Sequence, residues 1–245
     1  MTFWQTPRWH QYEEACGQTA GDRHRLLSQA PWKTRVLDLS IGRDGIWKGM
    51  RKSYRQEVRK GQSRFGVGDL SFLPRMRALH LKAAGRNTRS DRSWEIQGEW
   101  VRDGIGMCLI AHDLRTGDDV AFAYIVRHED WAYYFSAATL VPGAHHLLQW
   151  VAMCRLGACG VRWYETGWQG AAENEKEEGI EFFRRGFGGQ DLPASWQSPQ
   201  AGAQGLPGFP DGSLMPSGHK VPPWSLLEAF QAPCISYILG EVPKP

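Results

Sequence analysis

The chain lacks any apolar run of about eighteen residues, the shortest that commonly spans a membrane as a helix. Its N-terminus has no charged segment followed by an apolar core, so no secretory signal is predicted. The five cysteines are odd in number and scattered, and no C-x-x-C pair occurs. That distribution argues against a disulfide framework and indicates reduced thiols. Together these absences predict a cytoplasmic protein without a membrane span.

Metal ligands and excess charge are also sparse. His145 and His146 are adjacent, but no matching cluster of ligands lies near them in the sequence, so no metal site is predicted. The formal net charge is only +3 over 245 residues, a length that allows one large domain or two small ones. The twelve tryptophans are abundant by contrast. Many stand beside arginine, as Trp94 and Trp163 do, which is typical of ordinary arginine–indole packing.

The stretch 120–189 organises the rest of the chain. Its pattern predicts strands at 120–127 and 131–140, a helix after Pro142, a strand over 161–168 and a helix before Gly189. Strands joined by a crossover helix lie parallel, and such sheets bind ligands beyond the carboxyl ends of their strands. Those ends are 136–140 and 165–169.

Elements on either side complete a mixed sheet. Hairpin chemistry at 115–119 indicates that the strand 106–113 runs antiparallel to the strand that follows it. Further upstream the sequence predicts a strand at 34–40 and helices at 46–65, 69–85 and 93–101. The predicted organisation is an N-terminal helical segment at 1–30, an α/β domain at 31–189 and an irregular Pro/Gly-rich extension at 190–245, with a short helix near 224–230 and a last strand near 234–239.

The predicted helix 46–65 carries a stripe of positive charge. Its members recur at helical spacing and are Lys48, Arg51, Lys52, Arg55 and Arg59. Only Glu57 interrupts them, so salt bridges within the helix do not neutralise the stripe. An unneutralised basic face favours a bound anion, although a solvated helix face is the simpler interpretation.

Three strings in this order resemble Fem-type aminoacyl-tRNA-dependent transferases, a branch of the GNAT acyltransferase fold. They are Tyr164-Glu165-Thr166-Gly167 at a strand end, the segment Gly179 to Gly188 around Phe183-Arg184, and the basic helix from Trp47 to Gly61. The resemblance covers roughly residues 33–189. The opening F-W-Q-T-P-R-W also resembles that family, which usually carries a further GNAT-like domain after it. Here Pro31 follows almost at once, so the resemblance implies an acceptor other than the usual cell-wall precursor.

The resemblance implies a GNAT-like mixed sheet flanked by helices that transfers an aminoacyl group from tRNA to the amine of a small molecule or peptide. Arg184 stands where the family string has lysine, and an arginine there can clamp a phosphate or stabilise an oxyanion. Phe183 would stack on a terminal nucleotide, and the basic residues Arg51, Arg55 and Arg59 would hold the tRNA backbone. The donor is a co-substrate, so no cofactor is expected.

At the predicted strand end, Glu165 is the candidate general base, because apolar neighbours would desolvate its carboxylate. Tyr164 and Trp168, on either side of it, are candidate substrate-binding residues. Each assignment has a structural alternative. The carboxylate of Glu165 would hold the adjacent loop, Arg184 would form a surface ion pair, and Phe183 would pack in the core. The possible ion-pair partners of Arg184 are Glu177, Glu178 and Glu181.

Two other functions stay open. The first is an acyl-CoA-dependent N-acyltransferase of the same fold. Enzymes of that kind carry a glycine-rich pyrophosphate loop at a helix N-terminus, whereas the corresponding segment here, 140–144, holds Pro142 and one glycine. The second is a non-catalytic RNA-binding domain that uses the basic helix alone.

Overall fold

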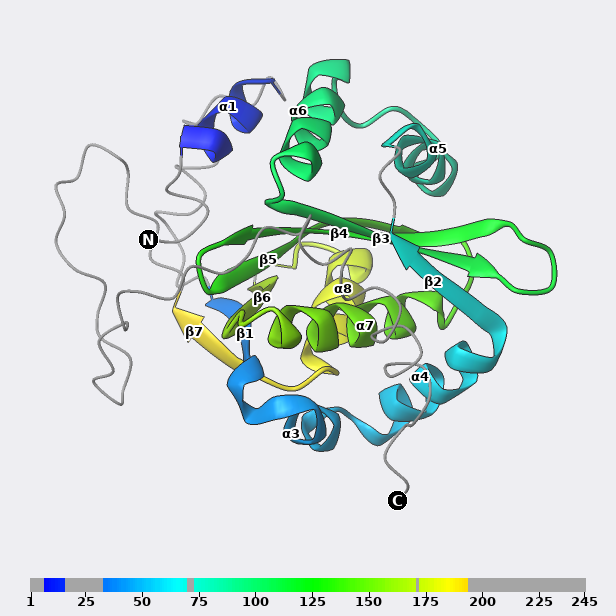
Figure 1. Ribbon diagram of the computed structural model, residues 1–245, viewed down its shortest axis with the longest axis vertical. Coiled ribbons are helices and arrows are strands. Elements are labelled where there is room, and N and C mark those ends of the chain that lie inside the picture. The colour runs from blue at the N-terminus through cyan, green and yellow to red at the C-terminus, as the bar shows by residue number, and fades with distance from the viewer. Residues whose placement is uncertain (1–6, 16–32, 70–72, 171, 194–245) are drawn as a thin grey trace, which may run out of the picture.

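A computed structural model describes residues 7–15, 33–69, 73–170 and 172–193 (Figure 1). Its centre is a seven-stranded mixed sheet in the order β2-β3-β4-β5-β6-β1-β7. The strands are β1 (Lys33–Asp38), β2 (Phe65–Asp69), β3 (Gly106–Asp113), β4 (Asp119–His128), β5 (Trp131–Thr139), β6 (Trp163–Gln169) and β7 (Gln190–Pro193).

Helices cover both faces of the sheet. On one face lie α1 (Pro7–Ala15), α5 (Leu73–Ala84) and α6 (Asp91–Arg102), drawn above the sheet in Figure 1. The 3-10 turn η2 (Leu39–Ile41) and the helices α3 (Gly42–Gly49), α4 (Lys52–Arg64) and α7 (Ala144–Ala158) lie toward the other face, and α8 (Glu175–Arg185) packs near β6. No helix within the described residues is long and apolar enough to cross a membrane.

The strand pairing matches the prediction from turn chemistry. β3, β4 and β5 form an antiparallel meander, and β5 pairs with β6 in parallel after the crossover through α7. β1 then pairs with β6 antiparallel on the far side. The predicted antiparallel and parallel neighbours of strand 131–140 are therefore confirmed.

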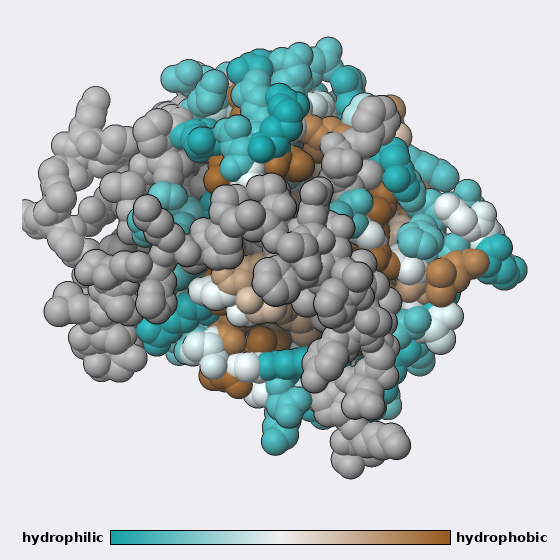
Figure 2. Space-filling view, in the orientation of Figure 1, coloured by the Kyte–Doolittle hydropathy of each residue, from teal (hydrophilic) through white to brown (hydrophobic). Residues whose placement is uncertain are grey.

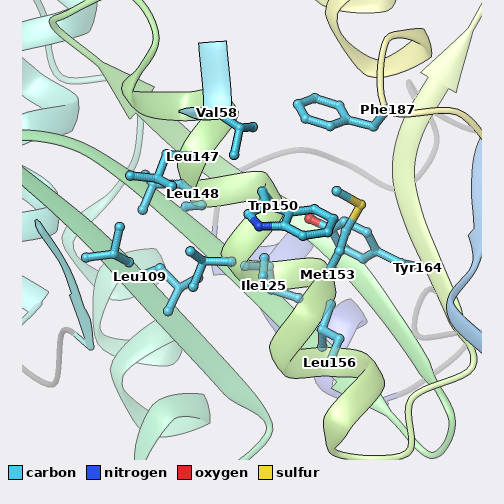
Figure 3. Close-up of a cluster of buried hydrophobic side chains, with 14 of the residues drawn as sticks. Val58, Leu109, Ile125, Leu147, Leu148, Trp150, Met153, Leu156, Tyr164 and Phe187 are labelled. Atoms are coloured by element: carbon cyan, nitrogen blue, oxygen red, sulfur yellow. The ribbon is translucent and has the colours of Figure 1, made fainter. Parts of the chain in front are cut away.

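Two buried clusters hold the helices to the sheet. α7 supplies one cluster with apolar side chains on nearly all its sides, which pack between the sheet and helices α3 and α4. Figure 3 shows this cluster, in which Tyr164 of β6 lies beside Trp150 and Met153 of α7. The second cluster joins α1, α5 and α6 to the opposite face. In Figure 2, hydrophilic residues gather over α6 and hydrophobic ones lie nearer the centre of the view.

The single helix predicted over 46–65 is wrong. The chain forms two helices, α3 and α4, separated at Met50 and Arg51, which both have extended backbone. Gly49, a weak helix former, ends α3, and the Arg51 amide donates to the carbonyl of Gly186 instead of continuing a helix. Arg51 consequently flanks α4 as its N-cap residue and is not part of one continuous stripe.

Two short strands depart from the predicted pattern. β2 follows α4 directly and pairs with β3, where no strand was predicted. β7 occupies 190–193, where irregular coil was predicted, and extends the sheet by pairing with β1. The predicted helix near 224–230 and strand near 234–239 lie outside the described residues, as does the part of the predicted N-terminal helical segment over 16–30. Within that segment, residues 7–15 form the helix α1.

Candidate active site

The two parallel strands at the centre of the sheet separate after a short paired segment, which leaves an opening in the backbone hydrogen bonding between them. β5 and β6 are paired only from Trp131 to Tyr133 and from Trp163 to Glu165. Beyond these residues the strands no longer pair with each other, since β5 stays with β4 and β6 stays with β1. The opening therefore faces the carboxyl ends of both strands, the position where parallel sheets bind ligands.

A β-bulge shapes the edge of this opening. Ile125 pairs with Tyr134 whereas the preceding Tyr124 pairs with Ser136, so Phe135 is an extra residue on β5. Tyr134 packs toward α7, while Phe135 packs toward the cluster under α5 and α6. Ser136 pairs with Tyr124 of that same cluster, so the bulge places the consecutive residues Phe135 and Ser136 on one face of the sheet.

Tyr134 joins a polar network inside the apolar α7 face. Its hydroxyl lies 2.9 Å from Nε2 of His145. Four residues along α7, Gln149 accepts a 2.8 Å hydrogen bond from the hydroxyl of Tyr164. Residues four apart share one helix face, so His145 and Gln149 meet the two tyrosines side by side. The positive charge of Arg184 acts on both tyrosines, which places α8 against the same network.

Burial keeps these groups neutral. It raises the pKa of Tyr134 well above its usual value, although the charge of Arg184 and the amide of Gln149 oppose the rise. Burial, together with the neighbouring His146, lowers the pKa of His145 to about 4, against the opposing effect of a backbone hydrogen bond at Phe122. An imidazole in this state is neutral at physiological pH, and it relays a proton when one ring nitrogen accepts a proton as the other releases one.

Arg184 is held in place by backbone groups of β6. Its Nη1 donates to the carbonyl of Trp168 over 2.9 Å. Its guanidinium lies against Gly167, where a Cβ would come 2.7 Å from Cζ of Arg184 and where φ is +112°. Only glycine combines that backbone angle with that close approach. Arg184 forms no ion pair with a described residue, so the surface pairing with Glu177 or Glu178 is not what positions it.

Two buried donors in this network make no hydrogen bond to a described residue. They are Nε of Arg184 and Nε2 of Gln149, whose side chain is 1% exposed and whose amide lies close enough to Tyr134 to lower the pKa of that hydroxyl. A buried donor without a partner costs free energy, roughly 1–3 kcal/mol each, and a bound acceptor would recover that cost. Both donors adjoin the Tyr134–Tyr164 pair, so a carbonyl or oxyanion that entered the opening would have two donors available.

Glu165, the candidate base, lies on the opposite side of the sheet. It is in the middle of β6 rather than at its end and is 3% exposed. Its carboxylate accepts hydrogen bonds from Oγ1 of Thr34 at 2.6 Å and from Nε1 of Trp131 at 3.3 Å. Adjacent strand residues face opposite ways, so Tyr164 reaches the network and Glu165 does not. The structure therefore does not bring Glu165 and Arg184 together.

The three arginines predicted to bind tRNA differ in their contacts. Arg51 stacks 4.0 Å from the ring centroid of Phe182, and Arg55 donates to the carbonyls of Trp47 and Lys48 at the end of α3. Arg59 is exposed and lies over the ring of Trp47. Arg51 and Arg55 therefore have structural contacts of their own, whereas Arg59 is the more accessible cation.

Phe183, the predicted stacking residue, is partly buried among rings of Tyr54, His145, His146 and Phe187. Its neighbour Phe182 is 55% exposed and carries Arg51 on its ring. An exposed ring with a guanidinium beside it offers a stacking surface that Phe183 lacks. Trp168 contributes its backbone carbonyl, which holds Arg184.

Tyr134, His145 and Gln149 were not among the predicted site residues. His145 was considered only as a metal ligand, and within the described residues no three His, Cys, Asp or Glu side chains gather as a metal site requires. A signal was nevertheless present in the sequence. His145 and Gln149 are polar residues four apart on a helix that is otherwise apolar on almost every side.

No protein-family model and no curated protein sequence matches the chain. Among solved structures, the crystal structure of FemX is similar, with a TM-score of 0.57 and 12% identity over 67% of this chain. The chain spans only 60% of the length of that FemX structure. The C-terminal domain of a putative lysylphosphatidylglycerol synthetase from Agrobacterium fabrum has a TM-score of 0.44 at 12% identity, covering 69% of this chain and 62% of that one.

The chain therefore has a GNAT-like fold, a mixed α/β sheet flanked by helices, as the sequence predicts. Within that class its fold is Fem-like, since FemX shares it.

The depressed pKa of His145 predicts a loss of stability in acid. The unfolded chain takes up a proton below about pH 6.5, whereas folded His145 takes it up only near its pKa of about 4. His145 therefore does not lower the free energy of unfolding above pH 6.5, but it lowers it progressively as the pH drops from 6.5 toward 4. Glutamine at this position preserves a hydrogen-bonding partner for Tyr134 but does not titrate.

We expect His145→Gln to lose less stability than the wild type between these pH values, by up to roughly 3 kcal/mol. Thermal unfolding of both proteins across the acid range measures the difference. Parallel losses in the two proteins would show that His145 is not held neutral.

Proposed function

We propose that this protein is an amide-forming acyltransferase that moves an aminoacyl group from aminoacyl-tRNA to the amine of a small molecule or peptide. The observation that carries the proposal is the pair of unpartnered buried donors, Arg184 Nε and Gln149 Nε2, beside the opening of β5 and β6. An ester carbonyl placed there would become an oxyanion when the amine attacks. Donors that are already in position stabilise such an oxyanion without reorganising.

The reaction needs no further co-reactant. The amine nitrogen bonds to the carbonyl carbon, the ester bond to the ribose oxygen breaks, and the proton released by the amine ends on that oxygen. The neutral Tyr134 hydroxyl and the His145 imidazole, hydrogen-bonded to each other, offer this proton a path. Both lie on the α7 side of the sheet with Arg184, whereas Glu165 lies on the other face and is not needed as a base in this arrangement.

One contact favours tRNA over coenzyme A as the donor. The N-terminus of α7, where an acyl-CoA enzyme would hold a pyrophosphate, is next to a carboxylate. Oε2 of Glu57 lies 3.2 Å from the place that a Cβ on Gly143 would occupy. The helix dipole already stabilises that negative charge, and a pyrophosphate would be repelled by it. The exposed Phe182–Arg51 pair and the cations of α3 and α4 instead suit a nucleic acid.

The direct test is donor dependence. The protein is incubated with an amine mixture and either charged tRNA or acyl-CoA, and new amides are detected by mass spectrometry. We expect amine-dependent release of the aminoacyl group from tRNA, and release that is slower by on the order of a hundredfold with Arg184→Ala. Amide formation from acyl-CoA alone would support the alternative acyltransferase. Binding of tRNA with no turnover from either donor would support an RNA-binding domain.

A second expectation concerns the exposed cations of α3 and α4. Lys48, Lys52 and Arg59 are exposed, so a triple alanine variant should remove phosphate contacts with little loss of stability. We expect weaker tRNA binding and a slope of log K against log salt that is flatter by about 2–3, close to one counterion per contact. Filter binding at several salt concentrations measures both quantities.

The matched control is a triple alanine variant of Arg75, Arg77 and Arg92. These arginines lie on α5 and α6, and each forms an ion pair with an acidic residue. Its affinity and slope should equal those of the wild type. Equal weakening by both variants would mean that overall charge, and not the face formed by α3 and α4, attracts the tRNA.

A further inference from the structure

A second cluster of unused hydrogen-bond donors lies on the opposite face of β5, under α5 and α6 (Figure 1). Its charged member is Arg89, which precedes α6. The guanidinium carbon of Arg89 is 5.4 Å from the ring centroid of Trp94 and 5.9 Å from that of Phe135. Phe135 is the bulge residue of β5, next in the chain to Tyr134. The cluster therefore borders the same bulge that shapes the candidate active site, from the other side.

Two neutral donors in this cluster are buried and have no partner in the described part of the chain. The indole Nε1 of Trp94 and the hydroxyl of Ser136 make no hydrogen bond there, and both residues are 5% exposed. Ser136 pairs across the sheet with Tyr124, whose side chain packs under α6, so Ser136 faces this side as well. Trp94 belongs to α6 and Ser136 to β5. Arg89 lies over the rings of Trp94 and of Phe135, which precedes Ser136 in the chain.

The charge of Arg89 has no acidic partner among the described residues. Within that part of the chain its hydrogen bond is a long 3.4 Å contact from Nη1 to Oε1 of Gln97. The acidic groups of α6 are engaged elsewhere, because Asp91 pairs with Arg77, and Glu95 and Glu99 pair with Arg92.

His80 is the remaining titratable group beside the cluster. Its ring centroid lies 5.3 Å from that of Trp94, and burial together with the charge of Arg89 lowers its pKa, which favours the neutral imidazole. The cluster thus presents one positive charge and two neutral donors between aromatic rings.

We propose that Arg89, Trp94 Nε1 and Ser136 Oγ bind a carboxylate of the amine that accepts the acyl group. One guanidinium and two neutral donors match the single charge and the two oxygens of a carboxylate, whereas a phosphate dianion would leave charge unmatched in an aromatic setting. The inference rests on the proposed acyl transfer. It specifies the acceptor as an amino acid or peptide with a free carboxylate, bound on the face of β5 opposite the donor.

The test compares two probes that differ only in this group, the dipeptide alanyl-alanine and its C-terminal amide. Protein labelled with 15N at the tryptophan indoles gives one Nε1–H signal for each tryptophan, and Trp94→Phe assigns the signal of Trp94. We expect the dipeptide to shift that signal and the amide to leave it in place. Trp150 is the internal control, since its indole is also buried and unpartnered but lies on the α7 face.

Arg89→Met should raise the apparent Kd for the dipeptide about tenfold or more, because a hydrogen bond to a charged group is lost. Arg77→Met, which removes an exposed arginine paired with Asp91, should leave the Kd unchanged. No shift of the Trp94 signal with the dipeptide, or equal shifts with the dipeptide and the amide, would overturn the proposal. If Arg89→Met does not fold, the comparison of the two probes on the wild-type protein still tests the proposal.

The site and the proposed function can fail separately. A shift of Trp94 by the dipeptide without any transfer from charged tRNA would retain the carboxylate site and reject the aminoacyltransferase. Transfer that is equally fast with the dipeptide and its amide, and unchanged in Arg89→Met, would retain the aminoacyltransferase and reject the carboxylate site.

Discussion

Arg184→Ala is expected to lower kcat/KM for aminoacyl transfer by on the order of a hundredfold, about 3 kcal/mol, which is typical for the loss of one oxyanion donor. Arg184 Nε is buried without an acceptor, while Nη1 is fixed by the carbonyl of Trp168. The side chain is therefore anchored at one nitrogen and available at another. Transfer assays with charged tRNA, at several amine concentrations, measure the effect.

Arg184→Lys should restore part of the activity, because one ammonium supplies the charge but cannot donate to Trp168 and to an oxyanion in the arginine geometry. The alanine variant should lose only about 1–2 kcal/mol of stability, since it forfeits one hydrogen bond from a charged group. Full turnover with a large fall in Tm would show that Arg184 only fastens α8 to β6.

The sheet could be predicted from the sequence because its signals are local. The turn at 115–119 fixes β3 against β4, and the crossover helix after Pro142 makes β6 parallel to β5. The break between α3 and α4 has no comparable signal. Gly49 alone rarely ends a helix, and the break depends on the bond from Arg51 to Gly186, which is far away in the sequence.

The short strands were missed for the same reason. β2 reads Phe-Gly-Val-Gly-Asp, and its glycines have weak strand preference. β7 lies at the start of a Pro/Gly-rich segment, and only its pairing with β1 makes it a strand. Elements stabilised mainly by long-range pairing leave little trace in local composition.

The candidate site was predictable only where a motif marked it. The string around Phe183-Arg184 pointed to Arg184, and the acid in Tyr164-Glu165 pointed to the face of β6 opposite Arg184. The partners of Arg184 come together through tertiary structure: the crossover through α7 brings His145 to Tyr134 and Gln149 to Tyr164. Neither contact can be derived from spacing along the chain.

Gln149→Met is expected to lower kcat by about 10²–10³-fold with little change in KM. Methionine fills a similar volume but removes Nε2, the second unpartnered donor in the opening. An oxyanion forms only as the amine attacks, so losing its donor affects the transition state and not substrate binding. Steady-state transfer kinetics with varied amine concentration separate the two parameters.

Gln149 also accepts a hydrogen bond from the hydroxyl of Tyr164. The same variant leaves that hydroxyl without its partner, which costs roughly 1–3 kcal/mol of stability. Tyr164→Phe alone removes this hydrogen bond but retains Nε2 of Gln149, and we expect it to keep most of the turnover. In the double variant, Gln149→Met with Tyr164→Phe, stability should recover because no polar group is left unpartnered, while kcat should stay low. Recovery of kcat together with stability would mean that Gln149 only holds Tyr164, and the oxyanion would then depend on Arg184 alone.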